Sequence, residues 1–102
     1  MSDFAAIDLG AESGRVVHGR FDGERVTLEV AHRFPNRPVR LPDGLHWNLL
    51  SLFAEALEGL RGLDVRGVGI DTWGVDYALL DREGRVLGLP FHYRDSRTDG
   101  MV

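Results

Sequence analysis

The 102-residue sequence has no cysteine and no long apolar run. Without cysteine, neither a disulfide framework nor a thiolate metal site can form. No apolar segment approaches the roughly 20 residues that a membrane-spanning helix needs. The N-terminus also lacks the basic and then apolar pattern of a secretory signal. We therefore expect a cytoplasmic protein with no membrane partner.

Basic charge is also scarce. Twelve arginine and lysine residues stand against sixteen acidic ones, which gives a formal net charge of −4, and no basic run stands out. Surfaces that bind nucleic acid neutralise phosphates with clustered cations. We therefore expect no nucleic-acid partner. The length and the hydrophobic content of 43% are those of one small globular domain.

The first third of the chain predicts an antiparallel meander. Apolar residues at 4–7 and an extended segment at 15–21 flank a glycine-containing turn, and a further strand is predicted at 26–34. The Asp22-Gly23 pair between the second and third strands is typical of a tight turn. Residues 35–44 contain three prolines and an Asp-Gly pair, so we expect an irregular loop there.

One helix is predicted, with Asn48 as its N-cap. We expect Gly59 to weaken this helix and Gly62 to end it. The helix should cover one face of the sheet, because its apolar residues recur at helical spacing and form one continuous stripe. These residues are Leu49, Leu52, Phe53, Ala56, Leu57 and Leu60.

The remaining chain predicts strands at 65–70, 75–80 and 85–87, with a turn at 82–84. The expected fold class is α/β, with a β-meander, one helix and further strands. A polar tail at 92–102, which contains Arg94 and Asp95, has no closing element. We therefore expect the chain to be an excerpt of a longer domain.

The first candidate site is the turn around residues 8–15. Consecutive backbone N–H groups in a glycine-rich turn can bind phosphate oxygens. Asp8 could hold a divalent cation, and Arg15 could contact a phosphate through its fixed fork of donors. Short glycine motifs also occur in ordinary hairpins, so a simple turn is the alternative.

A second carboxylate, Asp71, follows a strand just as Asp8 does. The ends of adjacent strands in an α/β sheet meet at one edge, where ligands bind. Such a pair would suit a Mg²⁺-nucleotide site or a two-metal nuclease of the ribonuclease-H type. The nuclease needs a helical carboxylate aimed at that edge, and Glu55 is predicted on the wrong side of the helix. A non-catalytic binding domain is the third possibility.

The aromatic residues and histidines in the candidate regions have simpler interpretations. A lone tryptophan more often fills a core or an interface than binds a sugar, and this applies to Trp47 and Trp73. His46 and His92 lack metal-ligand spacing, so we expect both to be structural or solvent-exposed.

Three segments resemble the FGGY family of sugar kinases, which has the actin/hexokinase-like ATPase fold. DLGAESGR resembles the phosphate-binding hairpin of that family. GIDTWGVDYALLD and LPFHYRDSRT are similar to the branch of the family that phosphorylates L-rhamnulose, and the HRFPN and LHWN segments between them fit the same branch.

The resemblance implies two ribonuclease-H-like domains with ATP and sugar in the cleft between them. Residues 1–102 would be the first part of the N-terminal domain, and the second domain and the general base would lie beyond. The implied reaction is transfer of the γ-phosphoryl group of ATP to the 1-hydroxyl of L-rhamnulose, with Mg²⁺. The isolated chain is expected to be inactive and to self-associate.

The resemblance also assigns residues to these ligands. One residue departs from the family, because Glu12 occupies a position where relatives carry a small hydroxyl residue. The implied contacts are Ala11, Glu12, Ser13, Gly14 and Arg15 for the ATP phosphates, Asp8 for Mg²⁺, and Trp73, Gly74 and Asp76 for the sugar.

Overall fold

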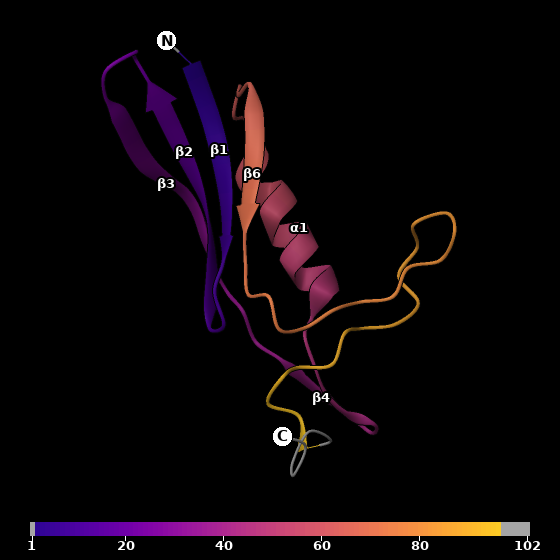
Figure 1. Ribbon diagram of the computed structural model, residues 1–102. Coiled ribbons are helices and arrows are strands. Elements are labelled where there is room, and N and C mark those ends of the chain that lie inside the picture. Colours follow the sequence, from indigo (N-terminus) through magenta and orange to yellow (C-terminus); the bar gives the residue numbers. More distant parts are fainter. Residues whose placement is uncertain (1, 97–102) are drawn as a thin grey trace.

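The computed structural model describes residues 2–96 (Figure 1). Strands β1, β2 and β3 form the predicted antiparallel meander, and β6 joins β1 in parallel, which gives the strand order β3-β2-β1-β6. The elements are β1 (Ser2–Leu9), β2 (Ser13–Phe21), β3 (Val26–Pro35), β4 (Val39–Leu41), β5 (Gly44–His46), α1 (Leu49–Leu60) and β6 (Gly67–Asp71). The α/β class is confirmed as a mixed sheet with one helix.

The second part of the predicted loop at 35–44 is instead a small ribbon. Strands β4 and β5 pair antiparallel across a two-residue turn. The ribbon is held from a distant part of the chain, because the backbone N–H of Leu45 donates to Asp95 Oδ1 at 2.8 Å and the N–H of His92 donates to the Leu45 carbonyl at 2.8 Å. No local pattern reports such contacts, which is why the loop prediction was wrong here.

The strands predicted at 75–80 and 85–87 do not form as such. Within the described residues this segment has a single isolated bridge, between Leu80 and Val86. The turn itself is present, since the N–H of Asp81 donates to the Arg85 carbonyl at 2.8 Å and Gly84 has a φ of +85°. A lone two-stranded hairpin without a neighbouring strand is marginal, which explains the failed prediction.

Helix α1 begins as predicted, because the Asn48 side chain accepts a hydrogen bond from the Ser51 N–H at 3.2 Å. It ends at Leu60, and Gly62 follows with a φ of +81°. The role of Gly59 differs from the expectation. A Cβ at Gly59 would lie 2.4 Å from a methyl group of Val16, so glycine is what allows the helix to approach β2 this closely.

The core lies between α1 and the sheet and consists of Ile7, Val16, Phe34, Leu52 and Ala56. The predicted apolar stripe of the helix is buried only in part, because Phe53 is 64% exposed and Leu57 is 50% exposed. The helix packs on β2 and β3. It therefore leaves part of its own apolar surface without a partner.

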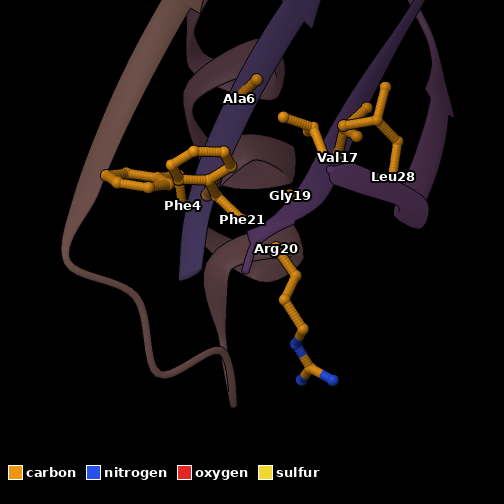
Figure 2. A pocket seen from close by; sticks show the side chains of 9 residues that line it. Phe4, Ala6, Val17, Gly19, Arg20, Phe21 and Leu28 are labelled. Carbon is orange, nitrogen blue, oxygen red and sulfur yellow. The ribbon is translucent and has the colours of Figure 1, made fainter. Parts of the chain in front are cut away.

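The other face of the sheet has no covering element among the described residues (Figure 1). Phe4 and Ala6 alternate with the buried Ala5 and Ile7, so they project to this opposite face. Figure 2 shows the hollow there, of about 420 Å³, which is lined by Phe4, Ala5, Ala6, Val17, Gly19, Arg20, Phe21, Val26 and Leu28. Between residues 2 and 96, no helix has the length and apolar character needed to cross a bilayer.

Candidate functional site

The two candidate carboxylates are neighbours, as predicted. Asp8 on β1 and Asp71 on β6 are register partners at the ends of adjacent parallel strands. Asp8 is also the partner of Arg15 on β2, and Arg15 Nε donates to Asp8 Oδ2 at 2.9 Å. The two side chains of this ion pair are 46% and 39% exposed, so solvent screens it and it contributes little to stability.

The turn between β1 and β2 brings the proposed phosphate contacts together. The N–H of Gly10 donates to the Ser13 carbonyl at 2.9 Å and closes the turn. Glu12 and Ser13 are exposed, whereas Gly14 is buried against Phe34. A Cβ at Gly14 would lie 2.4 Å from the Phe34 ring, so Phe34, near the end of β3, packs directly against this glycine at the end of the turn.

Asn36 is a contributor to this turn that the sequence did not reveal. Its backbone N–H donates to the Glu12 carbonyl at 3.0 Å, and its Nδ2 donates to the Gly10 carbonyl at 2.7 Å. The residue is only 3% exposed. The one available signal was its place at the end of the HRFPN segment, and both contacts cross more than 20 positions of sequence.

A buried aromatic stack lies next to the ends of β1 and β6. Trp47, which is 1% exposed, stacks on Trp73 at 4.0 Å and on His92 at 3.9 Å between ring centroids. Its Nε1–H donates to Asp76 Oδ2, which also accepts the Tyr93 N–H at 3.1 Å. Trp47 is therefore a core residue, as expected.

A hollow of about 220 Å³ adjoins this stack. It contains two of the three residues assigned to the sugar, Trp73 and Asp76, whereas Gly74 is exposed on the same loop and does not line it. The lining residues are Leu9, Trp47, Leu49, Leu52, Thr72, Trp73, Asp76, Tyr77, Ala78 and Pro90. Because Leu9 directly follows Asp8 on β1, the hollow and the carboxylate pair lie at the same end of the sheet.

The two histidines of this region are buried, and their pKa values are shifted in opposite directions. His46 Nδ1 lies 2.9 Å from the Leu89 carbonyl and Nε2 lies 2.7 Å from Asp43 Oδ1. The Asp43 carboxylate, with the Leu89 carbonyl, raises the pKa of His46 although burial opposes it. Burial, followed by the charge of Arg94, lowers the pKa of His92. Both histidines are structural, which is one of the two expectations.

The described residues contain no group of three or more metal-binding side chains. The candidate cation ligands are thus the two carboxylates Asp8 and Asp71. Glu55 instead lies with its Oε2 3.4 Å from Nε2 of His32 on β3, away from the Asp8–Asp71 edge. The helical carboxylate that a two-metal nuclease requires is therefore not in place, as the sequence predicted.

Curated proteins similar to this chain share one name. The chain is 42% identical to a rhamnulokinase of Pectobacterium atrosepticum over its whole length, and 45% identical to that of Mannheimia succiniciproducens over 98% of its length. It is 47% identical to a rhamnulokinase of Enterobacter sp. over 95% of its length.

The match covers only part of these relatives. The chain spans about one fifth of their length, 22% for the first two and 21% for the third. No family model matches the chain. By sequence, this chain is related along its whole length to the N-terminal part of the rhamnulokinase family.

Proposed function

We propose that this segment forms the phosphate end of an ATP-dependent sugar kinase. In the parent protein, by which we mean a chain of the relatives' length that contains this segment, the reaction would transfer the γ-phosphoryl group of ATP to the 1-hydroxyl of L-rhamnulose. The observation that carries the proposal is the pairing of Asp8 with Asp71 beside the exposed turn, in a chain 40–47% identical to rhamnulokinases.

The fold proposed for the parent is the ribonuclease-H-like domain of the actin/hexokinase-like ATPases. Three antiparallel strands followed by a parallel one, with a helix on one face, are compatible with that domain. The second domain would close the cleft, and the general base would also lie beyond this segment. Such closure matters because phosphoryl transfer depends on positioning and on exclusion of water.

The residues at the turn fit an ATP-phosphate site with Mg²⁺. Mg²⁺ is usually bound by one or two carboxylates together with substrate phosphates and water, and Asp8 with Asp71 offers such a pair. The contact of Arg15 with Asp8 uses Nε, and a guanidinium has further donors that can reach a phosphate. The exposed side chain of Glu12 can turn to solvent and so avoid the phosphates. The bound cation would neutralise charge on the transferring group.

The hollow beside the aromatic stack is the proposed sugar end of the site. Trp73 would supply an apolar surface, Asp76 a hydrogen-bond acceptor, and Gly74 an open approach for the sugar, since no atom lies within 4 Å of a Cβ at that position. The hydrogen bonds from Trp47 and Tyr93 fix the Asp76 carboxylate in place. A fixed carboxylate can select among ketoses by the direction of their hydroxyl groups.

The test is a substrate panel with the purified parent protein. Phosphorylation of L-rhamnulose, L-fuculose and D-xylulose is followed with saturating Mg²⁺-ATP. We expect the highest kcat/KM for L-rhamnulose. A higher value for another ketose would refute the sugar assignment, and an absence of ATP consumption with every sugar would refute the kinase. The nuclease alternative is not favoured, because Glu55 contacts β3 rather than the carboxylate pair.

A further inference from the structure

We propose that Asn36 is a positioning residue that fixes the turn at residues 10–13 so that its N–H groups face the ATP phosphates. The part of this inference that concerns ATP rests on the proposed function, whereas the part that concerns the shape of the turn does not. The inference goes beyond that function because Asn36 lies on another element, after β3, and is not one of the residues assigned to any ligand.

Two hydrogen bonds from Asn36 hold both sides of the turn. Asn36 Nδ2 donates to the Gly10 carbonyl at 2.7 Å, and the Asn36 backbone N–H donates to the Glu12 carbonyl at 3.0 Å. The turn is thereby tied to the end of β3 at two alternate peptide groups. Asn36 itself is buried, whereas Gly10 and Glu12, whose carbonyls accept these bonds, are exposed residues.

The direction of these carbonyls determines the direction of the neighbouring N–H groups. In a planar trans peptide the C=O of one residue and the N–H of the next point in opposite directions. Because the carbonyls of Gly10 and Glu12 point to Asn36, the N–H groups of Ala11 and Ser13 must point away from it. Ala11 and Ser13 are two of the proposed phosphate contacts. Asn36 would thus prepare the anion site without touching the anion.

The side-chain amide of Asn36 is used as a donor. Its Oδ1 is buried and has no hydrogen-bond partner, although buried polar atoms are normally satisfied. The amide is thus engaged with the turn through its N–H group, which donates to the Gly10 carbonyl.

The experiment compares two identical chemical changes, Asn36→Asp and Asn48→Asp, in the parent protein. An aspartate at 36 cannot donate to Gly10, whereas Asn48 acts as an acceptor toward Ser51, so aspartate preserves that cap. Asn36→Ala removes the donor without adding charge. We expect both changes at residue 36 to raise the ATP KM about tenfold and to leave the sugar KM within about twofold. Asn48→Asp should change neither constant.

A second readout separates the turn from catalysis. Amide hydrogen exchange is measured in the 102-residue chain without nucleotide, at Gly10, whose N–H is bonded to Ser13. We expect the Gly10 N–H to exchange about tenfold faster in Asn36→Ala than in the unchanged chain. In Asn48→Asp the exchange rate should not change. Unchanged exchange at Gly10, or an equal rise in both KM values, would refute the role of Asn36. A native parent that binds no ATP would instead refute the proposed function, and with it the nucleotide part of this inference.

Discussion

At the scale of single residues, Asp8 is the side chain on which the proposed site depends. It faces the cation of Arg15 across the hairpin and is the register partner of a second carboxylate, Asp71, across the parallel strand pair. Adjacent carboxylates repel each other unless a cation lies near both. Arg15 supplies one positive charge to Asp8, and the proposed Mg²⁺ would supply a second near both carboxylates.

Replacing Asp8 with asparagine in the parent should lower kcat by about 100-fold or more, with little change in the sugar KM. The reason is that Asp8 would place Mg²⁺ against the transferring phosphoryl group, where charge redistributes in the transition state. Steady-state kinetics with each substrate varied in turn provide the measurement. Intact kcat with a raised sugar KM would place Asp8 at the sugar end of the site instead.

At the scale of elements, the close approach of α1 to β2 depends on the absence of a side chain at Gly59. Gly59 is buried on the helix face that meets the sheet, and Val16 on β2 is fully buried beneath it. Helix propensity alone would favour alanine at this position by about 1 kcal/mol. Packing has the opposite preference, because Val16 and His32 occupy the space that a Cβ would need.

Gly59→Ala should therefore destabilise the chain by about 1–3 kcal/mol despite the gain in propensity. Urea unfolding at constant pH gives the free energy of unfolding. The matched control is Gly69→Ala on β6, where a Cβ would meet no atom within 4 Å and the effect should be small. Greater stability in Gly59→Ala would mean that α1 sits farther from β2 than the structure indicates.

The segment at 89–95 contacts β5 and Trp47 through two histidines whose pKa values are shifted in opposite directions. His46 lies between the Asp43 carboxylate and the Leu89 carbonyl, and its two ring nitrogens can both donate only when the ring is protonated. His92 is stacked on Trp47 and accepts the Arg94 N–H on Nδ1 at 3.0 Å, which requires a neutral ring. One histidine is therefore stabilised as a cation and the other as a neutral ring.

This difference predicts a stability maximum near pH 6.5, the ordinary pKa of histidine. The pKa of His46 is raised in the folded state, so its contribution is full below pH 6.5 and is lost as the pH rises through the folded value. The pKa of His92 is lowered, so stability is lost as the pH falls below 6.5 toward the folded value. Thermal unfolding between about pH 5 and 8 provides the measurement. His46→Gln should flatten the alkaline side, and His92→Gln the acidic side.

At the scale of the whole molecule, two apolar surfaces lack a covering element among the described residues. On one face, Phe53 and Leu57 of α1 remain exposed, and on the other lies the hollow lined by Phe4, Phe21 and Leu28 (Figure 2). Apolar surface of this extent drives association when nothing else covers it. The isolated chain should therefore behave differently from the same segment in a longer protein.

We expect the 102-residue chain to form dimers or larger assemblies at micromolar concentration. Light scattering and sedimentation measure the mass. Leu28 and Leu50 offer a matched pair, since they are 68% and 69% exposed but only Leu28 lines the hollow. Leu28→Glu should weaken association through the face of the sheet that bears the hollow, whereas Leu50→Glu, on α1, should leave the contact through that face unchanged. A monodisperse native monomer would contradict the prediction.

The chain alone should also lack kinase activity and bind ATP weakly. Phosphoryl transfer requires both substrates to be held between two lobes, and this chain spans about 22% of its relatives. A phosphate-binding turn by itself exchanges contacts with water for contacts with protein, so little net affinity remains. Calorimetry with Mg²⁺-ATP provides the measurement, and micromolar binding by the chain would contradict this view.

The sequence by itself determined the local features of this protein. The meander, the cap at Asn48 and the turn at Gly84 follow from alternation, capping and glycine conformation, which act within a few residues. The pairing of Asp8 with Asp71 was also predictable, because parallel strands of one sheet end at one edge. The resemblance carried by DLGAESGR and GIDTWGVDYALLD likewise needed no coordinates.

Only the tertiary structure decided the contacts between distant segments. It paired β4 with β5, left residues 75–80 without a sheet, exposed Phe53 and gave Gly59 a packing role. It also placed Asn36 against the turn, 26 residues from Gly10. The physical reason is the same in each case. These outcomes depend on which helices, strands and loops pack against each other. The spacing of apolar residues along the sequence indicates only which side of a helix or strand is apolar.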